Sequence, residues 1–252
     1  MKKFKFLVIS ILPFMWLIYI LFELFTGRIT NSTMLIGNIA LLFLFAIIGY
    51  IIYVSSLKFN NGLKRNQLII LFTILMILDQ GSKLLIKLFF FNDNIVIIKD
   101  FLSFNPIINT DGSWLNARFN TGIGFPILIF VNFIALFIFT EIYRYYNCKN
   151  KQSFWVDSCF IFMFAGALCS LIDKIFYGGS LDFIGIGDLF IADLKDIFIN
   201  LGVLFFIASM YISGAFDDDT DNSSLKDDIK AIGKFIAFIK TDIKKLCNRK
   251  KT

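Results

Sequence analysis

Six long apolar segments constrain the fold of this chain more than any other feature. They cover approximately residues 6–25, 34–56, 67–90, 125–143, 154–177 and 195–215. A helix that crosses a membrane needs about 20 mostly apolar residues, and each segment comes close to that length or exceeds it. The chain is 57% hydrophobic and has 33 Phe, more than a soluble core of this size needs. We therefore expect an all-α integral membrane bundle of about six transmembrane helices.

The basic residues gather in alternate loops and give the chain its net charge of +6. They precede the first segment, separate the second from the third and the fourth from the fifth, and follow the sixth. They are Lys2, Lys3, Lys5, Lys58, Lys64, Arg65, Arg144, Lys149, Lys151 and the lysines of the tail. By the positive-inside rule, both termini are expected in the cytoplasm of a bacterial cell, at the inner membrane. This distribution favours membrane lipids over nucleic acid as the partner of the positive charge.

The loops that face outward are then the one around Arg28 and residues 91–124 and 178–192. Residues 91–124 alternate β-branched stretches with turn residues, which predicts a small extracytoplasmic β element. Such an element can bind an extended peptide as an added strand.

The tail, residues 216–252, carries apolar residues at steps of three and four with lysines between them. This pattern predicts a basic amphipathic helix on the anionic inner leaflet. A helix that binds a protein partner is the alternative interpretation.

Histidine is absent, and the four cysteines (148, 159, 169 and 247) show no metal-binding spacing. Ser-His and Cys-His catalysis are therefore excluded, together with the commonest zinc ligand. Any chemistry must come from carboxylates, lysines or hydroxyl groups, and we expect neither a metal nor an organic cofactor.

Several charged residues interrupt the apolar segments. Asp79 and Lys83 lie four residues apart, on one helix face. They form either an ion pair that lets Lys83 extend outward to water or a charged group directed into a polar cavity. The first two apolar segments form a predicted helical hairpin, residues 1–60, with few polar residues inside its helices. Glu23 is the exception, and it lies near the outer end of its helix, where it can reach water. This hairpin is expected to be a packing or targeting appendage.

Two carboxylates, Asp182 and Asp196, flank the short polar loop before the sixth segment. A carboxylate at the edge of hydrocarbon is costly and is usually kept for chemistry or transport, and two facing carboxylates suggest a shared proton. Asp193, Asp196 and Asn200 share a helix stripe that we expect to face the bundle interior. Asp193 has a second interpretation as the N-terminal cap of the helix.

Four ordered blocks resemble those of lipoprotein signal peptidases (signal peptidase II), a family of intramembrane aspartic peptidases. They are Asp79-Gln80-Gly81-Ser82-Lys83 (D-x-x-[ST]-K), Asn109-Thr110-Asp111-Gly112 (the asparagine block of the outer loop), the stretch from Gly166 through Asp173-Lys174 and Gly178 to Leu181-Asp182-Phe183-Ile184 (G-N-x-x-D-R…G-x-V-x-D-F-I), and Leu194-Lys195-Asp196 with Gly202 (F-N-x-A-D…G). The resemblance covers roughly residues 67–215.

This resemblance implies an endopeptidase that removes signal peptides from diacylglyceryl-modified prolipoproteins. Asp182 and Asp196 would be the catalytic pair, near the outer face of the membrane. The supporting or substrate-binding residues would be Asp79, Lys83, Asn109, Ser170, Asp173, Lys174 and Asp193. The expected domains are a hairpin extension (1–60), a four-helix peptidase domain (61–215) and the tail (216–252).

Three positions depart from the family pattern: Ser170 and Asp193 stand where it has Asn, and Lys174 where it has Arg. Lys lacks the planar fork of Arg, and Asp193 adds a third carboxylate. An inactive paralogue that acts as a membrane scaffold is therefore one alternative. A transporter with a proton or cation route is another, although the polar residues cluster in the outer half of the membrane.

Overall fold

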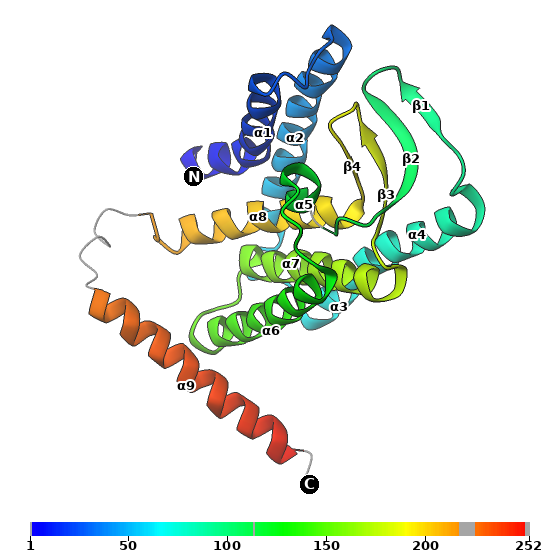
Figure 1. Ribbon diagram of the computed structural model, residues 1–252. Coiled ribbons are helices and arrows are strands. Elements are labelled where there is room, and N and C mark those ends of the chain that lie inside the picture. Colours follow the sequence, from blue (N-terminus) through cyan, green and yellow to red (C-terminus); the bar gives the residue numbers. More distant parts are fainter. Residues whose placement is uncertain (1, 113, 217–224, 250–252) are drawn as a thin grey trace.

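The computed structural model describes residues 2–112, 114–216 and 225–249 (Figure 1). Six helical segments are long and apolar enough to cross a membrane, as the sequence predicts. They are α1 (Lys2–Phe25), α2 (Ser32–Lys58), the continuous run of α3 (Arg65–Met76), η1 (Ile77–Gly81), α4 (Ser82–Leu85) and η2 (Ile86–Phe90), then α6 (Phe125–Lys149), α7 (Phe154–Ile172) with η3 (Asp173–Tyr177), and α8 (Leu194–Ile212).

The short segments η1, η2 and η3 are π-helical turns inside these helices. A π-helical turn inserts one extra residue into the helix and is often found at a functional site. Asp79 lies in η1, and Asp173 begins η3. Both carboxylates are fully buried.

A curved antiparallel sheet lies at one end of the bundle (Figure 1). Its strands follow the order β1 (Ile95–Ile98), β2 (Leu102–Asn109), β3 (Ser180–Ile186) and β4 (Phe190–Ala192). The sequence predicts the β1–β2 part and misses β3–β4, which it presents as a polar loop. The register between β2 and β3 shifts between Phe104 and Ile107, which accommodates Pro106, a residue without an N–H for the ladder.

Helices α7 and α8 cross closely because glycines line their contact. A Cβ atom on Gly202 would lie 2.5 Å from Met163 Sδ, and one on Gly166 would lie 2.7 Å from Ile199 Cγ1. Small residues allow membrane helices to approach in this way. The start of α8 is thereby fixed against the second half of α7, next to Asp173.

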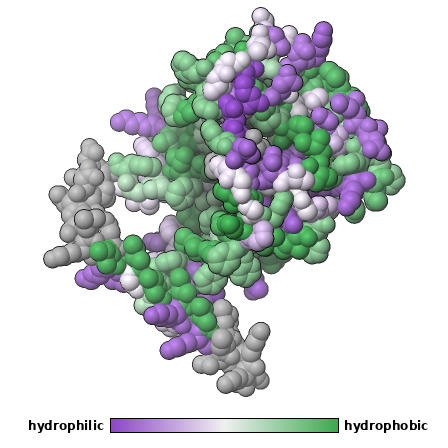
Figure 2. All heavy atoms as spheres, viewed as in Figure 1, coloured by the Kyte–Doolittle hydropathy of each residue, from purple (hydrophilic) through white to green (hydrophobic). Residues whose placement is uncertain are grey.

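The outer surface of the helices is largely apolar, as lipid contact requires. Figure 2 shows hydrophobic residues in green over much of the bundle and hydrophilic residues gathered over the end that carries the sheet. Large exposed apolar side chains include Phe43 on α2, Ile77 on η1 and Phe133 on α6. This multi-pass architecture confirms the predicted membrane bundle with its small β element.

The tail forms the predicted helix α9 (Leu225–Arg249), which stands apart from the bundle in Figure 1. It touches α6 through an ion pair between Arg144 and Asp242, and Phe235 and Phe238 pack against Tyr145. Residues 217–224 and 250–252 of the predicted tail lie outside the described residues. Ile229, Ile232 and Ile236 remain exposed along the helix.

Candidate active site

Asp182 is an inward-facing residue of the interior strand β3. It pairs with Ile107 of β2 and is 3% exposed. Its Oδ2 accepts a hydrogen bond from Asn109 Nδ2 at 2.9 Å, and its Oδ1 accepts one from Ser180 Oγ at 2.6 Å. Side chains two residues apart on a strand share a face. The local strand geometry therefore aims Ser180 at Asp182 from within the same strand.

Asp193 and Asp196 together begin α8. Asp193 is the N-cap, and its Oδ1 accepts a hydrogen bond from the Asp196 backbone N–H at 3.3 Å. The Asp193 backbone N–H donates in return to Asp196 Oδ2, also at 3.3 Å. This is a capping box, in which two otherwise unpaired N–H groups are satisfied and two carboxyl groups lie at the positive end of the helix. The capping role predicted for Asp193 is confirmed, and it extends to Asp196.

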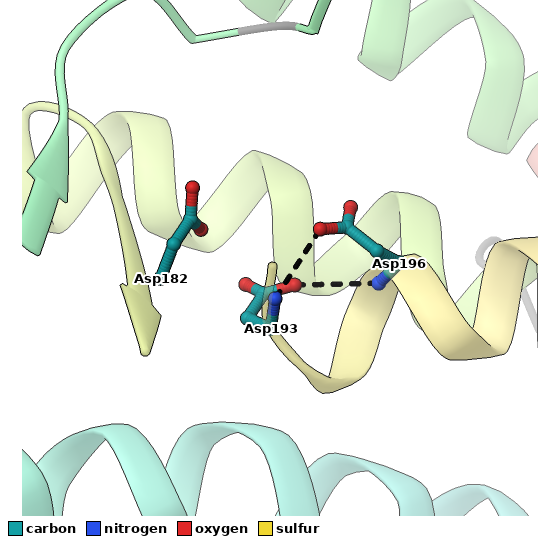
Figure 3. A group of neighbouring side chains, drawn as sticks. All are labelled: Asp182, Asp193 and Asp196. Atoms are coloured by element: carbon teal, nitrogen blue, oxygen red, sulfur yellow. Dashed lines mark hydrogen bonds between the residues drawn. The ribbon is translucent and has the colours of Figure 1, made fainter. Parts of the chain in front are cut away.

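The strand and the helix start bring three carboxylates together (Figure 3). One oxygen from each of Asp182, Asp193 and Asp196 lies within 4.8 Å of the others. Figure 3 shows Asp182 on β3 facing the start of α8, where Asp193 and Asp196 are joined by their two reciprocal hydrogen bonds. Asp182 and Asp193 are buried, whereas Asp196 is partly exposed.

Lys83 forms ion pairs with the buried carboxylates behind this group. Its ammonium nitrogen lies 2.9 Å from Asp79 Oδ2, 2.7 Å from Asp173 Oδ2 and 2.6 Å from Asp193 Oδ2, and its side chain is fully buried. A lysine ammonium has three N–H donors, so each of the three carboxylates can take one. The ion pair of Lys83 with Asp79 is therefore present, but Lys83 does not extend outward to water, and its ammonium lies among three buried carboxylates.

Lys195 is a second buried lysine in the site. Its Nζ lies 2.5 Å from Asp193 Oδ2, 2.5 Å from Ser180 Oγ and 3.6 Å from both Asp182 Oδ1 and Asp173 Oδ2. Its backbone N–H donates to Asp79 Oδ1 at 3.0 Å. Neither Lys195 nor Ser180 is predicted as a site residue from the sequence. Two features of the sequence could have indicated them. Lys195 is a lysine within an apolar segment, and Ser180 lies two residues before Asp182, on the same face if the segment is a strand.

Burial and neighbouring positive charges shift the pKa values of Asp182 and Asp193, which lie outside the membrane spans, in opposite directions. Burial raises the pKa of Asp182 above its usual value, although the Lys195 ammonium and the hydrogen bonds from Ser180 and Asn109 lower it. Burial also disfavours the ionised form of Asp193, but Lys195 and Lys83 outweigh it and hold the pKa of Asp193 below its usual value. The two lysines thus favour the ionised form of Asp193, whereas burial favours the protonated form of Asp182.

Ser170 and Lys174 contact each other at the edge of the network. Lys174 Nζ lies 2.6 Å from Ser170 Oγ, which also accepts a hydrogen bond from Asn132 Nδ2 at 3.1 Å. Both residues are buried, one helical turn apart on the same helix. Lys174 thus turns back along α7, and Ser170 links α7 to α6 through Asn132.

The predicted stripe on α8 is only partly correct. Asn200 is exposed, and its Nδ2 donates to the Asp196 backbone carbonyl at 2.8 Å instead of entering the interior. Asp193 is the N-cap and has extended backbone, so it lies outside the helical periodicity that the predicted stripe assumes.

Three carboxylates at this spacing are also a set that can ligate a cation. Here the Lys83 and Lys195 ammonium groups both contact Asp193 Oδ2, so the protein itself compensates that charge. Asp182 and Asp196 are left with oxygens that can face a small reactant.

Comparison with known proteins identifies the family. The model of the family described as signal peptidase (SPase) II matches residues 70–212, more than half of the chain. The chain belongs to this family. The match starts inside α3 and ends with α8, so it contains all the residues of the site described above and excludes α1 and α2.

Two curated relatives of this signal peptidase II chain are lipoprotein signal peptidases. The one from Fusobacterium nucleatum is 31% identical over 145 residues, which are 55% of this chain and 82% of the relative. The one from Thermodesulfovibrio yellowstonii is 31% identical over 141 residues, which are 53% of this chain and 87% of the relative. Both support a peptidase that acts in a membrane.

A solved structure, described as a bacterial membrane enzyme studied by the in meso method, has the same fold. It is 20% identical to this chain, with a TM-score of 0.51, and the match covers 66% of this chain and 98% of that one. This likeness concerns the fold, whereas the family match and the two curated relatives confirm the predicted family and the predicted peptidase class.

Proposed function

We propose that this signal peptidase II uses Asp182 and Asp196 as a catalytic dyad to remove signal peptides from diacylglyceryl-modified prolipoproteins. The observation that carries the proposal is the approach of the two carboxylates, whose nearest oxygens lie within 4.8 Å. A water molecule can lie about 2.8 Å from both oxygens at once. Two groups at this distance bind one water between them and share one proton.

The hydrogen-bond donors favour Asp182 as the ionised member. Asn109 donates to one of its oxygens, and Ser180 donates to the other. Ser180 Oγ accepts from Lys195 and lies 2.6 Å from Asp182 Oδ1, against 3.1 Å from Asp193 Oδ2 and 3.2 Å from Asp173 Oδ2, so the shortest of its three possible donations is to Asp182. Asp196 accepts only a long bond, from the Asp193 N–H, among the described contacts of its carboxylate. Hydrogen bonds to the charged form stabilise it, so Asp196 carries the shared proton at the start.

The reaction then follows from these two protonation states. Asp182 removes a proton from the bound water, and the water oxygen attacks the scissile carbonyl carbon. Asp196 donates its proton to the carbonyl oxygen as negative charge develops there. When the tetrahedral intermediate collapses, the C–N bond breaks and Asp182 gives its proton to the leaving amine. Asp196 recovers its proton from the new carboxyl product.

The two lysines hold this geometry. Lys83 joins Asp79 on α3–η1, Asp173 on η3 and Asp193 before α8, so one ammonium connects three elements. Lys195 joins Asp193 to the Ser180–Asp182 strand. Removing one partner of a buried ion pair costs about 3–5 kcal/mol, because the remaining charge has no counterion. The Ser170–Lys174 pair serves the packing of α7 against α6.

The charge distribution supports an active site on the outer side of the inner membrane, with both termini in the cytoplasm. The family match supports residues 61–215 as the peptidase domain, flanked by the hairpin of 1–60 and the tail of 216–252. A lipid-modified cysteine beside the cleavage site would keep the substrate at the depth of this sheet. The exposed apolar faces of the helices suit its acyl chains.

The test is cleavage of a lipid-modified prolipoprotein by the purified full-length chain. Asp182→Asn and Asp196→Asn keep the shape of the side chain but remove the shared proton, and each should lower kcat by at least about a thousandfold. Asp188→Asn, in the exposed turn after β3, is the matched control and should retain wild-type turnover. Near-wild-type cleavage by either dyad variant would eliminate the dyad, and an inert wild-type protein would favour the scaffold.

A further inference from the structure

The α1–α2 hairpin lies outside the matched family region, yet it contacts the strand that carries Asp182. Arg28, in the turn of the hairpin, donates from Nη2 to the backbone carbonyls of Asp188 at 2.5 Å and Leu189 at 2.7 Å. These two carbonyls belong to the turn that joins β3 to β4. Bonds to carbonyl groups fix the backbone itself, so Arg28 holds the turn that connects Asp182 to Asp193.

An apolar contact supports the same turn. Met34 of α2 is 1% exposed and packs with Phe101, Ile186 and Leu189 in one buried cluster. Gly187 has φ of +50°, and a Cβ atom there would lie 2.7 Å from Met34 Cε. The Met34 side chain thus fills the space that Gly187 leaves open.

Two rings of α1 extend this contact to the edge strand. The rings of Trp16 and Tyr19 meet the ring of Phe190 on β4 at centroid distances of 6.1 and 5.5 Å, in edge-on geometry. Edge-on aromatic pairs add about 0.5–1.5 kcal/mol each beyond the burial of their surface. Figure 1 shows the hairpin beside the β4 edge of the sheet.

Glu23 connects this support to a second segment. It is fully buried, so the expectation that it reaches water is wrong. Its carboxylate lies 3.4 Å from Arg28 Nη1 and 3.5 Å from Arg118 Nη2, and it accepts a hydrogen bond from Thr26 Oγ1 at 3.3 Å. Arg118 also lies over the Phe22 ring, 5.2 Å from its centroid.

Arg118 belongs to α5 (Trp114–Phe119), in the loop that follows Asn109. Glu23 therefore links the β3–β4 turn, through Arg28, with the loop on the other side of Asp182, through Arg118. A buried carboxylate is stable only when it is paired, and here its two partners come from segments that flank the active site. A simple packing appendage has no need for this arrangement.

We propose that the hairpin of α1 and α2 positions the catalytic strand, with Arg28 as the positioning residue and Glu23 as the charge that orients Arg28 and Arg118. The inference rests on the proposed function in one respect, that Asp182 is catalytic. A strand that moves by about 1 Å can cost a hundredfold in rate, so a modest loosening of β3 is measurable as lost turnover.

The test uses the full-length chain in lipid nanodiscs with two readouts. The first is hydrogen–deuterium exchange of backbone amides in residues 183–192, and the second is kcat and KM on lipid-modified prolipoprotein. Arg28→Ala should speed exchange in 183–192 and lower kcat roughly tenfold, with KM within about twofold of wild type. Exchange in α6 should be unchanged. Arg65→Ala, an exposed arginine at the start of α3, is the matched control.

Arg28→Lys provides a milder variant that keeps the charge opposite Glu23. It lacks the planar fork that reaches two carbonyls, so exchange and kcat should lie between those of wild type and Arg28→Ala. Unchanged exchange in 183–192 in both variants would overturn the support of the strand, whatever the activity. Faster exchange with wild-type kcat would overturn its role in catalysis. A wild-type protein without cleavage would reject the proposed function, and exchange would still decide whether the hairpin holds the strand.

Discussion

The Lys195 ammonium lies 2.5 Å from Asp193 Oδ2. Asp193, the third carboxylate of the site, therefore forms an ion pair within the protein, beside the proposed dyad. The same ammonium lies 3.6 Å from Asp182 Oδ1. Asp193, which stands where the family pattern has Asn, thus has the basic residue Lys195 as its neighbour in space. Each compensates the charge that the other introduces.

This pairing predicts a coupling between the two positions. Lys195→Ala leaves Asp193 and the dyad with one cation fewer, and Asp193→Asn frees Lys195 to bind Asp182, the proposed base. Each variant should lower kcat/KM by about tenfold or more. The combined Asp193→Asn/Lys195→Ala variant restores neutrality, keeps a good helix cap in Asn, and should recover most of the activity. Coupling energies of directly contacting residues are about 0.5–3 kcal/mol.

Steady-state cleavage by the four proteins of this cycle measures the coupling. Losses that simply multiply in the combined variant would contradict the pairing. The Asp188→Asn variant again serves as the control for a charge change on the same strand hairpin.

Asn109 controls the pH at which Asp182 becomes ionised. Its N–H stabilises the carboxylate, so Asn109→Ala should raise the pKa of Asp182, which burial already holds above its usual value. The base must be ionised to act, so the acid limb of the kcat/KM profile should move to higher pH by about one unit. Activity above the new pKa should be largely retained.

The pH–rate profile of Asn109→Ala is compared with that of Asn92→Ala, whose side chain is exposed before β1. An acid limb that stays in place, or a uniform loss at all pH values, would mean that Asn109 acts only through the fold of its loop.

The orientation of the chain can be tested with its own cysteines. Cys148 is exposed near the end of α6, in a loop predicted to be cytoplasmic, whereas Asp188 is exposed in the turn predicted to face outward. In a variant that retains Cys148 as its single cysteine, a membrane-impermeant maleimide should label the protein only after the cells are opened. Asp188→Cys in a cysteine-free chain should be labelled in intact cells. The reverse pattern would place the active site on the cytoplasmic side.

The sequence predicts the parts of this protein that obey periodic rules. Apolar run length predicts all six spans, because each span must be apolar over the full hydrocarbon thickness. The cap at Asp193 follows from the residue preference of a helix start. The π-helical turns at Asp79 and Asp173 leave no such trace, because one inserted residue barely alters an apolar pattern.

Contacts between distant segments explain what the sequence leaves out. From the sequence, Glu23 is expected at a water-facing helix end, and only the fold brings it to Arg118, which follows 95 positions later in the chain. The strand β3 reads as a polar loop in the sequence because Ser180 and Asp182, two residues of the site, are polar. Its strand structure depends on pairing with β2, which is distant in the chain. In the sequence, Lys195 is a charged residue at the start of an apolar span with no evident partner. In the fold, it contacts Asp193 and Ser180.

The capping box has a consequence for motion during turnover. Asp196 is at once the residue that closes the first turn of α8 and, in the proposed mechanism, the donor of a proton. Each proton that leaves or returns changes the charge that faces the positive end of the helix. The first turn of α8 should therefore tighten and relax once per cleavage, so that the backbone at this point takes part in the reaction coordinate.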